Sequence, residues 1–318
     1  MENSKSNFAH IIRQVADAEH LHLTSYAYDW VFHLEDDAGR GYFLYGYKFP
    51  INNAAAASLC DDKAALSERL AACETPHVPH RFFMSPRDLH YVGAQGDQAA
   101  MCAQFAAWNS RAVVKPNTGT GGYLVTFVQS KKELLQAADH IFASFPSLAL
   151  SPFVCIAQEY RVVMLDDQVQ LVFEKQRPGV TGDGVHTIAQ LASDLQLHLP
   201  HLEKNTVNFS RVPAKGEYVP LQWKHNLGQG AFAHLVTDPA LLTPLTCLSK
   251  RAMQNTDMRF ASVDIVHMTD HTYAVLEINS GVMLEHFAAQ SEENYRVARD
   301  IYRRVIRLLF DRNLFFNV

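Results

Sequence analysis

Residues 261–279 read ASVDIVHMTDHTYAVLEIN, and this stretch decides the fold. Two apolar, β-branched runs, at residues 261–266 and 273–278, flank a polar centre at Asp270 and His271. Such runs around a polar turn are typical of two antiparallel strands joined in a β-hairpin. The stretch therefore predicts a hairpin in the last fifth of the chain.

Carboxylates gather on one face of this predicted hairpin. Counting outward from the turn places Asp264 opposite Glu277, and strand alternation puts Asn279 on the face of Glu277. Opposed carboxylates repel each other, and a cation between them would remove that cost. Carboxylate and amide oxygens are hard ligands, suited to Mg²⁺ held together with nucleotide phosphates. The hairpin alone is compatible with a magnesium site or with a solvated polar face.

A glycine-rich turn lies upstream, directly after a lysine. Val113-Val114-Lys115-Pro116 ends a predicted strand and leads into Gly119-Thr120-Gly121-Gly122. Glycine lets backbone N–H groups approach phosphate closely, and Lys115 would add a point charge. No GK[ST] sequence follows and the turn joins two strands, which argues against a Walker A loop and a Rossmann fingerprint. The turn is therefore either a flexible loop over phosphates or a plain hairpin turn.

A lysine lies in the first turn of the helix that Asp61 and Asp62 open. An Asp N-cap predicts a helix from here to about Cys73, before Thr75-Pro76. Lys63 lies at the helix end where partial positive charge disfavours a cation. Its position is either incidental or explained by a phosphate that it faces.

The rest of the chain alternates short strands with helices. Helical spacing predicts helices at residues 8–20, 131–142, 240–255 and 292–309. Apolar and β-branched runs predict strands at residues 26–34, 42–49, 111–115, 123–128, 153–157, 160–165 and 168–174. Residues 178–230 have an irregular pattern, a long loop with some helix, of the kind that covers a functional site or serves as a linker. Because hairpins prevail over repeated βαβ units, the predicted fold class is α+β.

Composition narrows the functional classes. The 318 residues are 48% hydrophobic and 19% charged, which suits a globular protein of two or three lobes. A net charge of −5 argues against nucleic-acid binding, and no stretch reaches the roughly 20 apolar residues of a membrane span. The polar N-terminus lacks a signal-peptide core, so the expected location is cytoplasmic. Five cysteines without a CxxC spacing and scattered histidines predict neither a disulfide framework nor a zinc site.

These features occur in the order found in the ATP-grasp superfamily, which the chain resembles from about Asp61 to Asn279. The matching motifs are Asp62-Lys63, Val113-Val114-Lys115-Pro116 with the glycine loop, Glu159-Tyr160-Arg161-Val162, Val263-Asp264-Ile265 and Leu276-Glu277-Ile278-Asn279. Residues 177–188, RPGVTGDGVHTI, are similar to a segment of cyanophycin synthetases and of bifunctional glutathione-synthesising enzymes. The resemblance therefore points to the carboxylate–amine ligase branch.

The resemblance implies an α+β ATP-grasp fold with a small N-terminal lobe and two subdomains that clasp ATP between them. We expect the lobe at residues 1–60 and the central subdomain with its glycine-rich loop at residues 61–152. The C-terminal subdomain, with the metal site and a lid, is expected at residues 153–318.

The resemblance also implies a role for each matching residue. The residues expected to bind ATP are Lys63, Lys115, Gly119, Gly121, Gly122, Glu159 and the hinge Pro152, Phe153, Val154 and Cys155. The ligands expected for Mg²⁺, as two ions with Mn²⁺ as an alternative, are Asp264, Glu277 and Asn279. The residues expected to face the γ-phosphate or the substrate carboxylate are Arg161, Lys175, Arg177 and Asn226.

The sequence departs from the branch at three positions. Lys224 and Ala231 stand where its Arg-x-Asn-Leu-x-x-Gly-Gly segment has arginine and the last glycine. Ser262 stands where dipeptide-forming ligases often carry an arginine, two residues before the metal aspartate. Another cation must then stabilise the developing charge, and Arg177 and Lys224 are the candidates.

The implied activity is ATP-dependent amide formation through an acyl phosphate. The expected partners are a small-molecule carboxylate and an amine, such as an amino acid or a short peptide, and a homodimer also fits the resemblance. The main alternative is a small-molecule kinase of the same fold, which would phosphorylate its substrate without forming an amide. A nucleotide-binding protein without catalysis, or a structural module, would not need the complete set of lysines and metal ligands.

Overall fold

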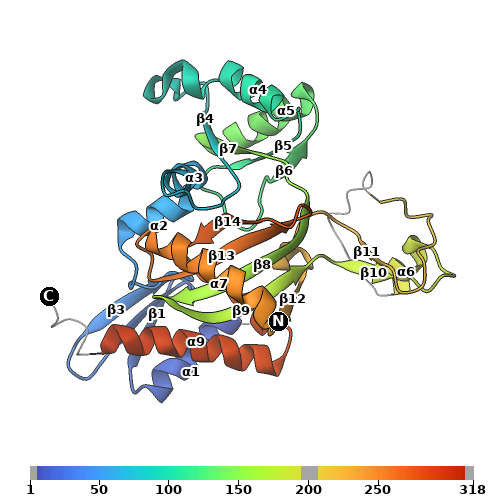
Figure 1. The fold of residues 1–318 in the computed structure, drawn as a ribbon. Helices are drawn as coiled ribbons and strands as arrows, with labels where there is room; N and C mark the ends of the chain where they lie inside the picture. The colour runs from blue at the N-terminus through green and yellow to red at the C-terminus, as the bar shows by residue number, and fades with distance from the viewer. Residues whose placement is uncertain (1–5, 195–206, 312–318) are drawn as a thin grey trace.

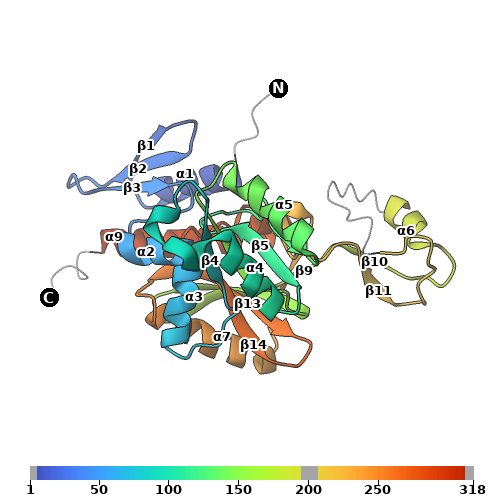
Figure 2. The same ribbon diagram turned by 90° about the horizontal axis from the view of Figure 1, so that it is seen from above.

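Four β-sheets organise the protein, which a computed structural model describes for residues 6–194 and 207–311 (Figure 1 and Figure 2). The largest sheet is antiparallel, with strand order β12 (Phe232–Leu235), β9 (Gln168–Gln176), β8 (Ile156–Leu165), β13 (Phe260–Met268) and β14 (Tyr273–Asn279). Strand alternation sends Val163 of β8 into one core and Val162 into the other. Both faces of this sheet are therefore covered.

Three helices cover one face of the five-stranded sheet. They are α2 (Ala54–Asp61), α3 (Lys63–Ala72) and α7 (Pro239–Gln254). Their side chains Cys60, Leu70 and Leu245 share a core with Val162 and Val263 of the sheet. Asp62 ends α2 and caps α3, since its side chain accepts a hydrogen bond from Ala65 N at 2.8 Å.

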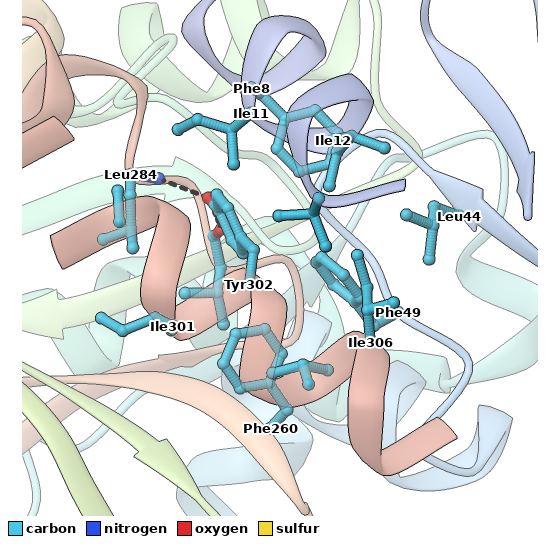
Figure 3. Close-up of a cluster of buried hydrophobic side chains, with 14 of the residues drawn as sticks. Phe8, Ile11, Ile12, Leu44, Phe49, Phe260, Leu284, Ile301, Tyr302 and Ile306 are labelled. Atoms are coloured by element: carbon cyan, nitrogen blue, oxygen red, sulfur yellow. Dashed lines mark hydrogen bonds between the residues drawn. The ribbon is translucent and has the colours of Figure 1, made fainter. Parts of the chain in front are cut away.

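The N-terminal segment and the C-terminal helix cover the other face together. This layer consists of α1 (Asn7–Ala18), the sheet β1 (His22–Tyr26), β2 (Val31–Glu35) and β3 (Gly41–Tyr45), α8 (Glu285–Ala288) and α9 (Glu292–Phe310). Tyr302 of α9 lies at the centre of their shared core, with its ring against Phe8 and Phe49 (Figure 3). Its hydroxyl donates to Val282 O at 2.7 Å and accepts from Leu284 N at 3.1 Å. The first and last described elements of the chain therefore form one core.

A second sheet lies above the first in Figure 1. Its strand order is β4 (Arg81–Met84), β7 (Ser147–Pro152), β5 (Ala112–Pro116) and β6 (Thr126–Val128). Helices α4 (Gln98–Ala107) and α5 (Lys131–Phe142) pack on it around a separate core, in which Met101, Leu134 and Ile141 are buried. The chain passes from this sheet to the larger one through residues 153–155, between β7 and β8.

An arm projects from the body between β9 and β12 (Figure 2). Its described elements are β10 (Gly179–Thr181), α6 (Ile188–Asp194) and β11 (Tyr218–Pro220). Val180, Ile188 and Leu221 form a small core of their own. The arm returns to the body at residues 222–229, which end in the turn η3 (Leu227–Gln229).

Much of the predicted element order is confirmed. The helices predicted at residues 8–20, 131–142, 240–255 and 292–309 are α1, α5, α7 and α9, and the C-terminal hairpin is β13–β14. Four strand predictions are wrong in their bounds. The strand predicted at residues 42–49 is too long, since β3 ends at Tyr45 and Gly46 begins a turn with a φ of 54°. Residues 26–34 contain a turn, because Ala27, Tyr28 and Asp29 have φ of 49°, 56° and 69°, so β1 ends at Tyr26.

Of the strand predicted at residues 153–157, only Ile156 and Ala157 lie in a strand, since β7 ends at Pro152 and β8 begins at Ile156. The strand predicted at residues 123–128 is shortened to β6, because the glycine-rich turn extends to Leu124, which has a φ of 55°. Helix α2 was not predicted at all. Among the described helices, none combines the length and the apolar character that a membrane crossing requires.

Candidate active site

The C-terminal hairpin brings its polar residues together in the predicted register. Asp264 pairs with Glu277 across β13 and β14, and a β-bulge follows directly after Asp264. The Asn279 amide nitrogen lies 3.4 Å from Glu277 Oε1 and 3.5 Å from Asp264 Oδ2. The two carboxylates and the amide therefore lie on one face of the sheet.

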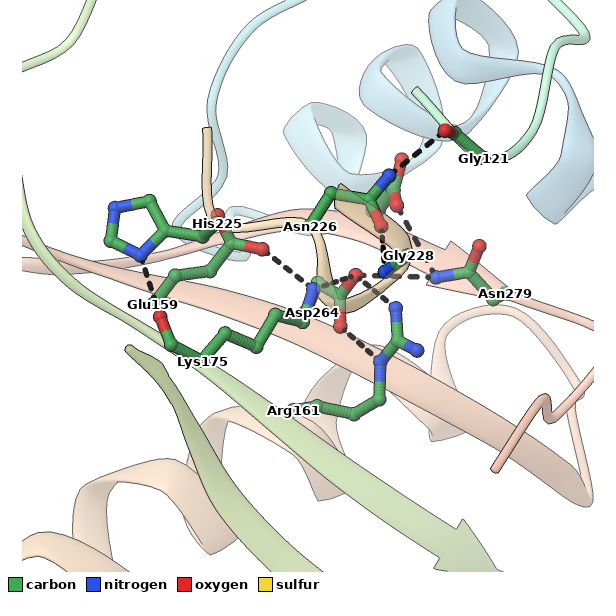
Figure 4. Close-up of polar contacts among 10 residues, drawn as sticks. Gly121, Glu159, Arg161, Lys175, His225, Asn226, Gly228, Asp264 and Asn279 are labelled. Carbon is green, nitrogen blue, oxygen red and sulfur yellow. Dashed lines mark hydrogen bonds and ion pairs between the residues drawn. The ribbon is translucent and has the colours of Figure 1, made fainter. Parts of the chain in front are cut away.

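Asp264 is surrounded by cations from the neighbouring strands (Figure 4). Arg161 of β8 lies opposite it in register and donates from Nε and Nη2 to its two oxygens, each at 2.8 Å. Lys175 of β9 donates to Asp264 Oδ2 at 2.7 Å and to Glu159 Oε1 at 2.6 Å. Only 1% of the Asp264 side chain is exposed. Burial alone would raise the pKa of Asp264, but Arg161 and Lys175 outweigh it and hold that pKa below its usual value.

Two further lysines lie beside this cluster. Lys63 Nζ donates to Gly119 O at 2.6 Å, and the Lys63 backbone N–H donates to Asn117 O at 3.2 Å. Lys115 of β5 is 6% exposed. Burial, reinforced by the charge of Lys63, lowers the pKa of Lys115 to about 8, against the opposing effect of Glu277 and Glu159. Lys63, the lysine in the first turn of α3, therefore contacts the glycine-rich loop.

The glycine-rich loop is attached at both ends. Gly121 and Gly122 have φ of 70° and 73°, a left-handed conformation that favours glycine. Asn226, which follows the arm, donates from Nδ2 to Gly121 O at 2.8 Å. A Cβ at Gly122 would lie 2.9 Å from the same Asn226 nitrogen. Lys63 on one side and Asn226 on the other therefore hold the loop over the charged cluster.

The predicted hinge residues connect the two sheets. The Phe153 backbone N–H donates to Arg111 O at 3.0 Å, and Cys155 O accepts from Thr269 N at 3.0 Å. The Phe153 ring lies 4.1 Å from Phe127 and 6.4 Å from Trp223, centroid to centroid. Val154 packs instead against a small core with Val78 and Val266, and Pro152 closes β7. A cluster of three aromatic rings, from three segments of the chain, thus lies at the junction of the sheets.

Arg177 lies apart from the carboxylates. It is about half-buried, which lowers its pKa, and its backbone carbonyl accepts a hydrogen bond from the Tyr218 hydroxyl. It forms no ion pair with any residue of the described ranges. Lys224, the other cation suggested in place of an arginine at residue 262, lies over the Trp223 ring at 5.6 Å. The cations in contact with Asp264 are Arg161 and Lys175.

The structure adds residues that the sequence patterns did not indicate. Asn117 Oδ1 accepts from Ala64 N at 3.1 Å, so Asn117 joins the glycine-rich loop to the start of α3. His225 is 6% exposed and contacts the backbone of Lys175. His80 is also buried, and burial together with Lys115 and Lys63 lowers its pKa well below the usual value. The position of Asn117, directly after Pro116 at the end of the predicted strand, could have indicated its role. No sequence pattern marks the two buried histidines as part of the site.

Comparisons with known proteins agree with this architecture. No family model matches the chain. The glutathione biosynthesis bifunctional protein GshAB of Listeria monocytogenes is 23% identical over 244 residues, which cover 68% of this chain and 31% of that protein. This chain therefore spans about a third of the length of that relative.

Solved structures of ligases share the fold. A bifunctional glutathione synthetase from Pasteurella multocida superposes with a TM-score of 0.58 at 16% identity, over 96% of this chain and 44% of that chain. The D-alanine–D-alanine ligase from Bacillus anthracis superposes with a TM-score of 0.53 at 14% identity, over 81% of this chain and 69% of that chain. The fold that these two structures share with this chain confirms the predicted α+β ATP-grasp fold.

Proposed function

We propose that this protein is an ATP-dependent ligase that joins a carboxylate to an amine. The observation that carries the proposal is the charge of the buried cluster. Four cations (Lys63, Lys115, Arg161 and Lys175) lie with three carboxylates (Glu159, Asp264 and Glu277) beneath a glycine-rich loop. One cation is in excess, which suits a bound polyphosphate. The ligases with the same fold support an amide-forming reaction over the kinase alternative.

The cluster also suits Mg²⁺, by the chemistry of its oxygen donors. Glu277 and Asn279 lie at its edge, and among the described residues Glu277 accepts a hydrogen bond only from Asn279. Asp264 already contacts Arg161 and Lys175, so a metal ion would share this carboxylate with them. Glu277, Asn279 and Asp264 would therefore hold the metal, which when bound neutralises phosphate charge.

The protein residues contribute mainly by positioning and by balancing charge. Lys63 and Lys115 would hold phosphate oxygens under the glycine-rich loop. Glu159 and Asp264 fix Lys175 Nζ between them, so this ammonium is oriented before substrate arrives. Arg161 and Lys175 would then stabilise the charge on the transferring phosphoryl group.

Two chemical steps follow from this arrangement. A substrate carboxylate attacks the γ-phosphorus and forms an acyl phosphate, with ADP as the leaving group. The amine then attacks the acyl carbon, loses a proton and expels inorganic phosphate. The arm would exclude water from the acyl phosphate between the steps.

The segment after Asn279 would form the acceptor site. Ser280 Oγ donates to Asp61 Oδ1 at 2.8 Å, and Val282 N donates to Tyr47 O at 3.1 Å. This segment therefore bridges the hairpin and the N-terminal layer. Its apolar residues favour an amino acid or a short peptide as substrate.

The test measures ADP release with Mg-ATP across a panel of amino acids and dipeptides. Hydroxylamine is added in parallel, because it traps an acyl phosphate as a hydroxamate. We expect release that requires both an acid and an amine, and hydroxamate formation with the acid alone. Asp264→Asn should abolish both signals. Asp166→Asn, which removes an exposed ion pair with Arg259, is the matched control and should retain them.

A stable phosphorylated product without amine incorporation would contradict the ligase and establish the kinase. Unchanged ADP release in Asp264→Asn would show that the charged cluster has no role in the reaction.

A further inference from the structure

His225 is a buried histidine with one nitrogen unused. Its side chain comes from residues 222–229, the segment that returns from the arm, which we call the strap. His225 Nδ1 lies 2.8 Å from the backbone carbonyl oxygen of Lys175 (Figure 4). Nε2 is buried and has no hydrogen-bond partner among the described residues.

The contact with Lys175 fixes the tautomer of His225. A carbonyl oxygen only accepts hydrogen bonds, so Nδ1 must carry the proton. Burial lowers the pKa of His225, which keeps the ring neutral near pH 7. Nε2 is then an acceptor, and a buried acceptor without a donor is energetically unfavourable. The ring is therefore arranged to accept a hydrogen bond from a group that the described residues do not supply.

The strap places this acceptor between two parts of the candidate nucleotide site. Two residues before it, Trp223 lies against the aromatic rings of Phe127 and Phe153 at the junction of the sheets. One residue after it, Asn226 holds the glycine-rich loop through Gly121. A nucleotide with its base at the aromatic junction and its phosphates under the loop would have its sugar between them.

The charges around the ring favour the same position. Glu159 is a carboxylate whose charge acts on His225, and Lys175 contacts both residues, His225 through its backbone carbonyl and Glu159 through its ammonium. Glu159 is also the residue expected to bind ribose. We propose that His225 Nε2 accepts a hydrogen bond from a ribose hydroxyl of the bound nucleotide. This inference rests on the proposed function, because it requires ATP at the cluster.

The test compares nucleotide affinities by calorimetry, without any acid or amine present. His225→Asn keeps an amide N–H near Nδ1, which can still donate to Lys175 O, but it removes the acceptor at Nε2. We expect His225→Asn to weaken ATP binding about two- to tenfold, the range for one hydrogen bond. Either 2′-deoxy-ATP or 3′-deoxy-ATP, whichever lacks the donating hydroxyl, should bind wild-type protein and His225→Asn with equal affinity.

His225→Gln is the second variant, since its longer side chain places an amide oxygen near the Nε2 position. We expect it to recover part of the discrimination between ATP and the deoxynucleotide. Equal weakening of ATP and both deoxynucleotides would overturn the proposal, because His225 would then act only through the fold. Purine riboside triphosphate, which lacks the adenine amine, provides the other contrary outcome. If it alone removes the difference between wild type and His225→Asn, the base and not the ribose is the donor.

The two proposals fail in different ways. If the wild-type protein binds ATP and forms amide, and His225→Asn binds every nucleotide with the same affinity, then the ligase proposal stands and the role proposed for His225 is wrong. Wild-type protein that binds no ATP removes both.

Discussion

Lys175 contacts two buried carboxylates at once, and its own side chain is 6% exposed. Replacing it by methionine would keep the volume of the side chain but leave Glu159 without its ion-pair partner, with Asp264 still paired to Arg161. Removing one partner of a buried pair typically costs about 3–5 kcal/mol. We expect Lys175→Met to lower the free energy of unfolding by about 3 kcal/mol in urea titrations.

An exposed pair gives the matched control for this prediction. Arg259 and Asp166 form a two-bond ion pair whose side chains are 43% and 41% exposed. Arg259→Met should cost under about 1 kcal/mol, because water screens such pairs. Equal losses in the two variants would show that the Lys175 network does not stabilise the fold.

The lowered pKa of Lys115 would make the proposed nucleotide binding a proton-linked event. With a pKa of about 8, Lys115 is mostly neutral at pH 9 in the free protein. A phosphate beside it favours the charged form, so ATP binding should take up a proton between about pH 8 and pH 10. Calorimetry in buffers of different ionisation enthalpy counts this proton. Lys115→Arg stays charged and should bind without uptake; uptake by this variant as well would assign the proton to another group.

The glycine-rich loop is the element in which backbone conformation and contact act together. Gly122→Ala would introduce a left-handed alanine, which costs about 1–2 kcal/mol, and would place Cβ 2.9 Å from Asn226 Nδ2. We expect lower stability and weaker ATP binding, because the contact between loop and strap must shift. Gly39→Ala is the control: Gly39 has a φ of 76° with no atom within 4 Å of the added Cβ. It should lose similar stability and keep its ATP affinity, and a loss of affinity there would refute a local effect of the loop.

Local patterns explain which elements the sequence could predict. The pairing of Asp264 with Glu277 follows from strand alternation across a short turn, so two strands and one turn suffice to derive it. The pairing of Asp264 with Arg161 joins strands about 100 residues apart and depends on the register of β8 against β13. No periodicity encodes that register, so the contact between Arg161 and Asp264 could not be predicted from the sequence.

The same limit applies to the elements that depend on the surrounding fold. Four of the eight residues of helix α2 are alanine, and its helical state is stabilised by the packing of Ala56 and Cys60 on the sheet. The role proposed for His225 depends on its contact with Lys175, which lies 50 residues away in the sequence. Charge and glycine patterns predicted the candidate site, whereas its buried polar partners required the three-dimensional structure.

At the scale of the whole molecule, Tyr302 couples the closing helix to the proposed acceptor segment. Its hydroxyl bonds with Val282 O and Leu284 N, and its ring packs on Phe8 and Phe49. Tyr302→Phe keeps the ring and leaves two buried backbone groups without a partner. Each such group costs about 1–3 kcal/mol. A loss of this size is large compared with the net stability of most proteins.

We therefore expect Tyr302→Phe to lower the melting temperature by several degrees, at about 2–4 °C per kcal/mol. Its ATP affinity should stay at the wild-type value, because within the described residues no hydrogen bond joins the Tyr302 hydroxyl to the charged cluster, whereas the KM of the amine should rise as residues 282–284 loosen. Tyr91→Phe, at a tyrosine that is 75% exposed, serves as the control and should change none of the three. A melting temperature that falls while both substrates keep their affinity would restrict Tyr302 to stability. A loss of ATP affinity would instead show that the N-terminal layer and the nucleotide site are coupled across the five-stranded sheet.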